Sequence, residues 1–453
     1  MSTSVNHLKL IDFKYVKNIY SIKKPITSFN DSLEVEGDKS LSIRWALLAS
    51  QATGKSKAIN ILKSEDVFNT LKCLKMLGVK IKFYKKICEI DGLGINGYRF
   101  KKNIILDAGN SGTLARLIMG LLIHTKNKIK ILGDKSLSQR DFYRVITPLE
   151  KFGARFISKK GKLPIIIKGT KSPKSIEYRE NLGSAQCKTA IMFAALNTKG
   201  TTTIKAKKSR NHTELLFKYL NIPIKIKKQK NYDLIKVKSV KKINSLNYKI
   251  PSDISSCAFF IVLTILAKNS KLRLTNVNIN PSRIGIIKIL KKMNAKIEFK
   301  NIKNYKGEKV ADILVKSTKN LKPINCPTNL NSSAIDEFLV IFLIAAKANG
   351  VSNFKNLAEL NQKESPRLQW GSKILKLLGI KTITNKNSIK IFGNPNLTVN
   401  KKIIIKNFSK DHRVFMTSVI AALAFGGSWY IHDKDSIKTS FPTFLKKIKI
   451  LNK

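Results

Sequence analysis

Six times along the chain, a short polar cluster runs directly into an apolar stretch with the pattern of a buried helix. One residue marks each cluster: Lys39, Asn110, Ser184, Asp253, Asp336 and Asp411. The intervals between successive markers are 71, 74, 69, 83 and 75 residues, which indicates an internal repeat. Side-chain oxygens of Ser, Asn and Asp accept hydrogen bonds from the unpaired N–H groups of a first helical turn. The clusters therefore predict six helix starts.

A second helical pattern lies between these starts, in six segments rich in Leu and Ile. They are 70–80, 148–154, 215–223, 289–295, 374–380 and 444–448. The first five end with Gly or Asn, where a helix C-terminus needs a left-handed residue. Clustered or alternating apolar residues usually follow, as at 81–84 and 297–299, and predict strands. The sequence therefore predicts an α/β fold of six units, each with a buried helix, an outer helix and strands.

The length of the chain, 453 residues, exceeds one ordinary hydrophobic core, and six units divide naturally into two domains of three. The longest apolar runs, 259–267 and 338–346, are shorter than the roughly 20 residues that span a bilayer. Residues 1–14 have neither the apolar region of a signal peptide nor a transit pattern. We therefore expect a cytoplasmic protein without a membrane partner.

The cysteines and histidines give no indication of a metal or an organic cofactor. The five histidines form no HExxH pattern, and the cysteines have no metal-ligand spacing. The cysteines are Cys73, Cys88, Cys187, Cys257 and Cys326. We expect buried, inert thiols, no metal and no cofactor.

The chain carries 86 Lys and Arg residues against 28 Asp and Glu residues, a formal net charge of +58. Such a charge can indicate nucleic-acid binding through phosphate contacts. Here the lysines are spread along nearly the whole chain, and aromatic residues are not interleaved with them as stacking platforms require. A general compositional bias is the simpler explanation, so we expect no specific nucleic-acid partner. The charge should still speed encounters with anionic ligands.

Arginine is distributed differently from lysine. Only 12 of the basic residues are Arg, and several of them lie in or beside the polar clusters. Those are Arg44, Arg116, Arg140, Arg210, Arg283, Arg367 and Arg413. The planar guanidinium binds carboxylates and phosphates through two parallel hydrogen bonds, so this placement favours anion binding. We interpret Arg210 and Arg283 as structural ion pairs, and Arg116 as a brace behind its loop.

The polar clusters contain recurring motifs in a defined order. Gly37-Asp-Lys-Ser-Leu-Ser-Ile-Arg44 recurs as Gly133-Asp-Lys-Ser-Leu-Ser-Gln-Arg140, with Asp107-Ala-Gly-Asn-Ser-Gly-Thr-Leu-Ala-Arg116 between them. Glycines let the backbone approach a ligand, and neighbouring N–H and hydroxyl groups are donors. Then follow Ser184-Ala-Gln186, Asp336-Glu337, Glu359-Leu-Asn-Gln-Lys-Glu-Ser-Pro-Arg367 and Asp411-His-Arg413. From about Gly37 to Pro442, this series resembles the 5-enolpyruvylshikimate-3-phosphate synthases, a family of enolpyruvyl transferases.

The resemblance implies an inside-out α/β barrel of two domains, with the active site in the cleft between them. The first, discontinuous domain would comprise 1–36 and 251–453, and the second 37–250. The implied reaction, a step of the shikimate pathway to aromatic amino acids, transfers the carboxyvinyl group of phosphoenolpyruvate to the 5-hydroxyl of shikimate 3-phosphate. It releases phosphate and needs neither a metal nor a cofactor. We expect a monomer.

The resemblance also assigns roles to residues of this chain. Asp336 is the implied base for the 5-hydroxyl proton, and Lys39 and Glu364 are implied to move a proton to and from the methylene carbon. The residues implied to hold phosphoenolpyruvate are Lys39, Gly112, Arg140, Gln186, Arg367 and Arg413. Those implied to hold shikimate 3-phosphate are Lys39, Ser40, Arg44, Ser184, Ala185, Gln186, Ser209, Asp336 and Lys363. Addition across an enol double bond needs such a base, an acid and cations for the substrate anions.

Four positions depart from the family pattern. Asp141 replaces a usual Pro and places an acid beside Arg140, and Phe338 replaces a Pro that commonly follows the acidic pair. Pro366 replaces an Asp that would cap a helix, so we expect it to begin that helix instead. Lys438 is one position out of register with a phosphate-binding Lys of some members and is a minor candidate only.

Two alternative functions are less favoured. The related transferase that acts on UDP-N-acetylglucosamine has Asn where this chain has Ser40, and a Cys in a mobile loop. This chain has no Cys between Cys88 and Cys187. The segment Thr53-Gly-Lys-Ser56 imitates a phosphate-binding P-loop, but Ala49 stands where the first Gly is required. We expect a turn at the end of a helix there.

Overall fold

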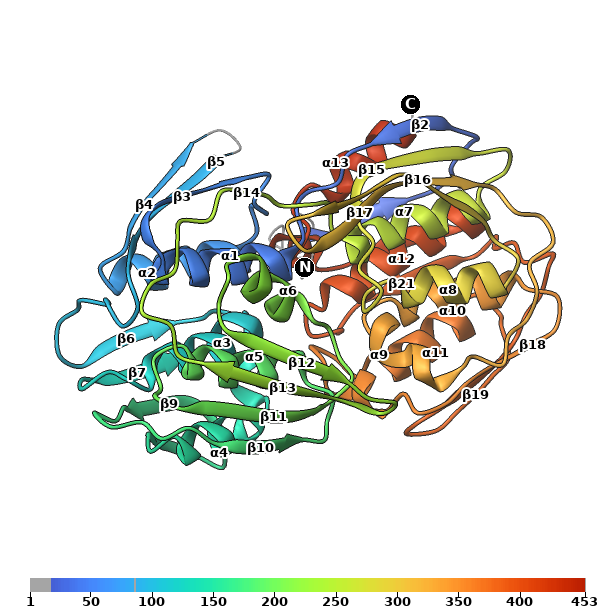
Figure 1. Ribbon diagram of the computed structural model, residues 1–453. Coiled ribbons are helices and arrows are strands. Elements are labelled where there is room, and N and C mark those ends of the chain that lie inside the picture. The colour runs from blue at the N-terminus through green and yellow to red at the C-terminus, as the bar shows by residue number, and fades with distance from the viewer. Residues whose placement is uncertain (1–17, 85–86, 453) are drawn as a thin grey trace, which may run out of the picture.

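The computed structural model describes residues 18–84 and 87–452, and it consists of two lobes (Figure 1). One hydrophobic core is drawn from two separate parts of the chain, within 22–35 and 254–451. The other core lies within 41–250. We call these the split lobe and the continuous lobe. The part of the sequence predictions that concerns 1–17 lies outside the described residues.

Each lobe has three inner helices, and together they account for the six apolar runs of the sequence. Those of the continuous lobe are α1 (Lys39–Gln51), α3 (Gly112–Leu122) and α5 (Ala185–Ala195). Those of the split lobe are α7 (Ile254–Leu266), α10 (Phe338–Lys347) and α12 (His412–Phe425). In five of them, a side chain accepts a hydrogen bond from a backbone N–H two or three residues further on. The five caps are Asp38, Ser111, Ser184, Asp253 and Asp411.

The predicted helix starts are therefore confirmed, but three of the markers are not the caps themselves. Lys39 and Asn110 lie directly beside their caps. Asp336 precedes α10 by two residues, and its carboxylate binds cations instead of backbone N–H groups. The N-cap position of α10 belongs to Glu337, whose carboxylate accepts a hydrogen bond from the Ser255 hydroxyl.

Six outer helices occupy the predicted Leu- and Ile-rich segments. They are α2 (Glu65–Met76), α4 (Tyr143–Lys151), α6 (His212–Tyr219), α8 (Gly285–Lys292), α11 (Arg367–Leu377) and α13 (Phe444–Leu451). The first five are followed by residues with positive φ, between 54° and 101°. These are Gly78, Gly153, Asn221, Asn294 and Gly379, so the predicted left-handed ends are confirmed.

Each unit also has one small sheet, and all but one of these six sheets combine a parallel pair with antiparallel strands. The continuous lobe has three sheets, whose strands are given in their spatial order. The first is β14 (Tyr248–Lys249), β3 (Thr53–Ile59), β5 (Ile87–Leu93) and β4 (Lys80–Tyr84), and the second is β6 (Ile104–Asp107), β7 (Lys128–Leu132), β9 (Lys162–Lys168) and β8 (Arg155–Lys159). The third is β10 (Glu177–Glu180), β11 (Thr201–Lys207), β13 (Tyr232–Lys238) and β12 (Ile224–Lys228). The expected turn at 53–56 is therefore wrong, because this segment begins strand β3.

The split lobe has one sheet of four strands and two of three, and in the sheet that contains residues 351–354 both pairs of strands are antiparallel. In spatial order, the first sheet is β16 (Lys296–Tyr305), β17 (Glu308–Lys316), β15 (Lys271–Asn278) and β2 (Asn30–Leu33). The second is β18 (Val351–Phe354), β20 (Ile389–Phe392) and β19 (Thr382–Thr384), and the third is β1 (Tyr20–Ile22), β22 (Ser428–Ile431) and β21 (Lys402–Ile405). In the third of these sheets, β21 and β22 are parallel, and β1 adds to β22 as an antiparallel strand.

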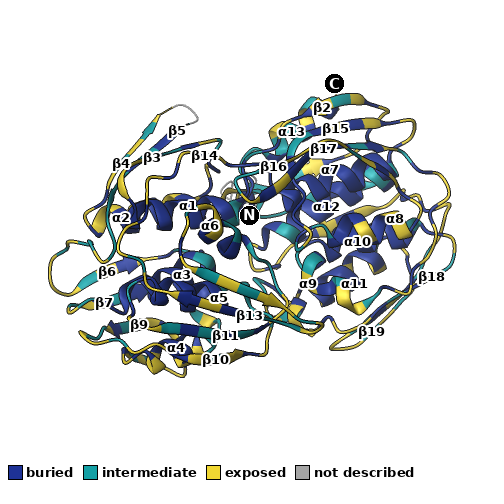
Figure 2. Ribbon diagram, viewed as in Figure 1, coloured by how far each residue is buried: buried dark blue, intermediate teal, exposed yellow. Residues whose placement is uncertain are grey.

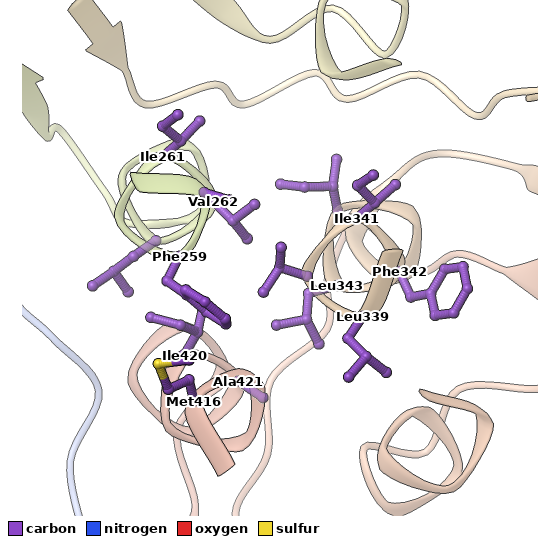
Figure 3. Packing of buried hydrophobic residues seen from close by; sticks show 14 of the residues in the cluster. Phe259, Ile261, Val262, Leu339, Ile341, Phe342, Leu343, Met416, Ile420 and Ala421 are labelled. Carbon is purple, nitrogen blue, oxygen red and sulfur yellow. The ribbon is translucent and has the colours of Figure 1, made fainter. Parts of the chain in front are cut away.

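The helices lie inside each lobe and the sheets lie outside. Figure 2 shows inner helices that are buried along their length and strands that alternate between buried and exposed residues. In the split lobe, α7, α10 and α12 pack together through side chains such as Val262, Leu343 and Ile420 (Figure 3). Burial of each such side chain contributes about 1.5–3 kcal/mol. The predicted fold class, an inside-out arrangement of six α/β units, is confirmed.

The chain passes between the lobes at two neighbouring places. Residues 36–38 run beside residues 251–253, where Asp38 N donates to the Pro251 carbonyl at 2.8 Å and Asp253 N donates to the Glu36 carbonyl at 3.1 Å. Both crossings lead directly into a capped inner helix, α1 in one lobe and α7 in the other. The crossing therefore joins two helix N-termini.

The helices and cysteines of the described residues show two further features. None of their helices is long and apolar enough to cross a membrane. All five cysteines are free and buried, as expected.

Candidate active site

Residues of both lobes surround the carboxylate of Asp336. Arg210 Nη2, from the continuous lobe, lies 2.5 Å from Asp336 Oδ2. From the split lobe, Arg367 Nη1 lies 3.4 Å and Lys363 Nζ 3.8 Å from Oδ1. The carbonyl of Asp336 accepts a hydrogen bond from Arg413 Nη1 at 2.7 Å. Asp336 therefore lies where the two lobes meet.

The electrostatic state of this carboxylate follows from two opposing effects. Burial raises the pKa of Asp336, because a charge is poorly solvated in the interior. Four neighbouring cations outweigh burial and hold this pKa well below its usual range. They are Arg210, Lys363, Arg413 and Arg367. Asp336 is therefore ionised at neutral pH.

Glu364 and Asp411 share one deeply buried guanidinium. Arg367 is 2 % exposed, and its Nε donates to Asp411 Oδ2 at 2.9 Å while its Nη2 donates to Glu364. Arg140, from the other lobe, approaches Glu364 Oε1 at 3.4 Å. Burial raises the pKa of Glu364, but Arg367 and Arg140 hold it well below its usual range. We call Arg140, Arg210, Asp336, Lys363, Glu364, Arg367, Asp411 and Arg413 the interlobe cluster.

Gly112 lies against the arginines of the continuous lobe. A Cβ atom at this position would lie 2.9 Å from Arg116 Nη1 and 3.3 Å from Arg140 Nη1, so even a methyl group would press on both guanidinium groups. Arg116 Nη1 donates to Gln186 Oε1 at 2.9 Å. Gln186 Nε2 donates in turn to the Thr113 hydroxyl at 2.9 Å, so the amide is fixed in orientation. Arg116 therefore has the bracing position that the sequence suggested.

Arg44 is buried and is held by neutral oxygens only. Its Nε donates to the Thr213 hydroxyl at 3.0 Å, its Nη1 to the Ser40 carbonyl at 3.1 Å and its Nη2 to the Thr189 hydroxyl at 3.4 Å. Burial lowers the pKa of Arg44 to about 10, so the guanidinium stays charged at neutral pH.

The remaining candidates for shikimate 3-phosphate lie near helix N-termini of the continuous lobe. Ser184 caps α5 by accepting from Cys187 N at 3.2 Å, and Ala185 is the first residue of that helix. The hydroxyl of Ser209 is buried and has no partner among the described residues. A buried hydroxyl without a partner costs about 1–3 kcal/mol, which a bound ligand could recover.

Lys39 begins α1, and its side chain binds an acid of its own lobe. Its Nζ lies 2.9 Å from Asp66 Oδ2, and its backbone N–H donates to Asp253 Oδ2 at 3.3 Å. Lys39 is also one of the cations that lower the pKa of Glu364. It therefore lies within the electrostatic reach of the interlobe cluster.

The sequence interpretation missed some of these contacts. Arg210 does form an ion pair, but its partner is Asp336, so it belongs to the interlobe cluster. Its position among the clustered arginines was the available signal. Arg283 is the expected structural pair, with Nη1 2.8 Å from Asp38 and Nη2 3.0 Å from Asp253. Asp66 was not foreseen, because it lies outside every polar cluster of the sequence.

The structure places the four departures from the family pattern as follows. Asp141 Oδ1 accepts a hydrogen bond from Tyr143 N at 2.9 Å, at the start of α4. Phe338 is buried in the core of the split lobe. Pro366 immediately precedes α11, close to the expected helix start. Lys438 is 56 % exposed and pairs with Asp435 at 3.3 Å.

No group of three or more His, Cys, Asp or Glu side chains that could hold a metal ion occurs within 18–84 and 87–452. The chemistry of the interlobe cluster is that of arginine, lysine and carboxylate. Such a cluster can bind multiply charged anions and transfer protons.

Comparison with known proteins gives consistent results at three levels. A family model described as EPSP synthase (3-phosphoshikimate 1-carboxyvinyltransferase) matches residues 23–448. A 3-phosphoshikimate 1-carboxyvinyltransferase from Ruthia magnifica subsp. Calyptogena magnifica is 41% identical over 426 residues, covering 94% of this chain and 96% of the relative. One from Petrotoga mobilis is 37% identical over 427 residues, covering 93% and 96%.

The solved structures agree with the fold described above. An EPSP synthase from Acinetobacter baumannii superposes with a TM-score of 0.85 and 33% identity, covering 96% of this chain and 98% of the other. The enolpyruvyl transferase NikO from Streptomyces tendae has a TM-score of 0.74 at 12% identity, covering 96% and 97%. At that identity the second likeness concerns the fold alone.

Proposed function

Since this chain belongs to the EPSP synthase family of 3-phosphoshikimate 1-carboxyvinyltransferases, we propose that its interlobe cluster carries out the family reaction. In this reaction the carboxyvinyl group of phosphoenolpyruvate is transferred to the 5-hydroxyl of shikimate 3-phosphate, and phosphate is released. The observation that best supports the proposal is the position of Asp336, an ionised carboxylate between cations of both lobes.

Asp336 acts as the base in this proposal. Its pKa is low while Arg210, Lys363 and Arg367 face it without a bound anion. Phosphate and carboxylate groups of the substrates offset those cations, so the pKa of Asp336 rises on binding and the carboxylate becomes a better proton acceptor. Substrate binding thus prepares the base for the 5-hydroxyl proton.

Lys39 and Glu364 transfer the proton to and from the methylene carbon. Lys39 carries a proton as an ammonium group beside Asp66, and Glu364 is ionised between Arg367 and Arg140. One group can therefore donate and the other accept, as addition followed by elimination requires.

The remaining assignments concern binding. Phosphoenolpyruvate is held by Lys39, Gly112, Arg140, Gln186, Arg367 and Arg413. Shikimate 3-phosphate is held by Lys39, Ser40, Arg44, Ser184, Ala185, Gln186, Ser209, Asp336 and Lys363. The contacts of Arg44 support this, because three neutral oxygens hold its guanidinium group and leave its charge for an anion.

Three further points are part of the proposal. The split lobe and the continuous lobe are taken as the two domains, supported by their separate cores. The protein is taken as a cytoplasmic monomer, on the sequence pattern alone. The alternative substrate, UDP-N-acetylglucosamine, is not adopted, because Ser40 departs from that enzyme's pattern and the relatives named above are 3-phosphoshikimate 1-carboxyvinyltransferases.

The test is phosphate release from the purified protein with both substrates and without divalent metal. Asp336→Asn and Lys39→Met should each lower turnover by about 10²-fold or more, the usual share of general acid–base catalysis. Unchanged thermal unfolding would show that both variants fold. Near-normal turnover in either variant would contradict its assigned role, and no phosphate release by the parent chain would contradict the function.

A further inference from the structure

The segment that carries Arg210 is docked into the other lobe by the two residues that follow it. Asn211 Oδ1 accepts hydrogen bonds from Asn280 Nδ2 at 2.9 Å and from the Ser282 hydroxyl at 3.1 Å. Both donors belong to the split lobe. His212 begins α6, and its Nδ1 lies 2.5 Å from Oε1 of Glu308, also in the split lobe. Neither side chain of the His212–Glu308 pair is exposed.

The partners of His212 determine its tautomer. Arg283 Nη1 lies 3.1 Å from His212 Nε2, and an arginine can only donate. Nε2 must therefore accept, so the proton of the neutral imidazole is on Nδ1 and is donated to Glu308. This assignment rests on the hydrogen-bond partners of the ring. His212 thus joins a carboxylate and a guanidinium that both come from the split lobe.

Glu308 and Arg283, the two partners of His212, form further hydrogen bonds of their own. Glu308 Oε2 accepts from Asn278 Nδ2 at 3.2 Å and from Asn280 Nδ2 at 2.9 Å. Arg283 is anchored by Asp38 and Asp253 at the crossing of the chain and donates to the Ser255 hydroxyl at 2.8 Å. Glu308 and Arg283, the two partners of His212 on the split lobe, are therefore each held in place by further hydrogen bonds.

A hairpin extends the same contact. Glu308 opens β17 directly after the turn from β16, and that turn reaches the continuous lobe next to α6 (Figure 1). The Tyr305 hydroxyl accepts from Lys249 N at 2.8 Å, and Lys306 Nζ lies 5.3 Å from the centre of the Tyr219 ring. The hairpin thus holds both the segment before α7 and the end of α6.

We propose that Asn211 and His212 are positioning residues: they dock the 209–212 segment into the split lobe and so hold Arg210 against Asp336. The inference rests on the proposed role of Asp336. A buried donor or acceptor without its partner costs about 1–3 kcal/mol, so the network is satisfied at one relative placement of the lobes only. At that placement Arg210 lies 2.5 Å from Asp336.

The first experiment is a double-mutant cycle of His212→Ala and Arg210→Ala, measured by phosphate release. His212→Ala alone should lower kcat by about 10²-fold, the usual effect of misplacing a reacting group by about 1 Å. In the Arg210→Ala background, the same change should lower kcat by less than about two-fold, because coupled residues are not additive. Losses that multiply, or an unaffected kcat in His212→Ala, would overturn the proposal.

Two variants control for a general loss of structure. His212→Asn keeps a donor at the position of Nδ1, so it should recover turnover by about ten-fold over His212→Ala, the worth of one good hydrogen bond. Lys218→Ala changes an exposed residue of the same helix and should match the parent. If His212→Asn does not recover turnover relative to His212→Ala, the contact with Glu308 does not position Arg210.

The second experiment does not depend on turnover. In ¹⁵N-histidine NMR, the signal of His212, identified by its loss in His212→Ala, should be that of a neutral ring protonated at Nδ1. A ring protonated at Nε2, or at both nitrogens, at neutral pH would overturn the docking described here. A chain without transferase activity would contradict the proposed function and leave this result standing.

Discussion

The two lobes hold the arginines of the candidate site in different ways. In the continuous lobe, Arg44 donates to the Thr213 hydroxyl and Arg140 to the Asn110 amide oxygen, and Arg140 meets a carboxylate, that of Glu364, only across the boundary between the lobes. In the split lobe, Arg367 is held by three carboxylates, those of Asp336, Glu364 and Asp411. The groups of the continuous lobe that hold these two arginines therefore do not offset their charge, whereas the charges of the split lobe largely offset one another.

This difference separates two tasks. Neutral oxygens of the continuous lobe fix Arg44 and Arg140 without cancelling their charge, which suits the binding of phosphate and carboxylate groups. The acids of the split lobe are held ionised by arginine and lysine, which suits proton transfer. Arg140–Glu364 and Arg210–Asp336 are the pairs that join the two sets, so a bound anion competes with them.

The largest effect is expected for an acid of the split lobe. Glu364→Gln removes a proton acceptor and should lower kcat by about 10²-fold or more. Calorimetry should show that shikimate 3-phosphate still binds. Glu359→Gln is the matched control: Glu359 is 49 % exposed and pairs with Arg144 at 3.6 Å, so its loss should change kcat by less than about two-fold. Equal losses in both variants would show that Glu364 has no specific role in proton transfer.

Arginine-to-lysine changes should act on binding more than on turnover. Arg140→Lys and Arg413→Lys each replace a planar fork by a single ammonium. Each should raise KM for phosphoenolpyruvate by about ten-fold, the size of one lost charge-assisted hydrogen bond. Steady-state kinetics with varied phosphoenolpyruvate measure this. An unchanged KM would show that the arginine concerned is structural.

A smaller effect is expected for a group that holds Arg44. Thr213→Val keeps the shape of the side chain but leaves Arg44 Nε without an acceptor. KM for shikimate 3-phosphate should rise by about five-fold, the effect of a net hydrogen bond of about 1 kcal/mol. Thr213→Ser restores the hydroxyl and should restore KM. If Thr213→Ser does not restore KM, the methyl group of Thr213 affects the binding of shikimate 3-phosphate and its hydroxyl does not.

The smallest and most gradual effect concerns acid stability. Burial raises the pKa of Asp411, but Arg367 outweighs it and holds this pKa below its usual range. A carboxyl with a lowered folded pKa stabilises the protein above its unfolded pKa, about 3.9, and this stability is lost as pH falls toward the folded value. Urea unfolding between pH 6 and pH 3 should therefore show decreasing stability, with a shallower slope in Asp411→Asn. An equal slope would show that Asp411 does not contribute.

Local signals explain why so much of the fold could be predicted. A capping side chain and a left-handed helix end depend on residues within one turn, so Ser184, Asp253 and Gly78 could be identified without tertiary information. Asp336 shows the limit of this reasoning. A carboxylate before an apolar run predicts a helix cap, but the carboxylate of Asp336 interacts with four cations instead of with backbone N–H groups.

Contacts between residues of different lobes could not be predicted from the sequence. Arg210 and Asp336 are 126 residues apart, and their contact depends on how two lobes are oriented. His212 and Glu308 are 96 residues apart for the same reason. The family resemblance supplied residue types in order, but neither the partner of Arg210 nor the role of Asp66 follows from order alone.

The split core also determines when each part of the molecule can be completed during synthesis. The continuous lobe has all its strands once β14 has been made, so it can fold while later residues are still being added. Strand β1 must wait for β22, which is made about four hundred residues later. On the ribosome, strand β1 therefore emerges before the whole continuous lobe and is among the last strands to find its partner.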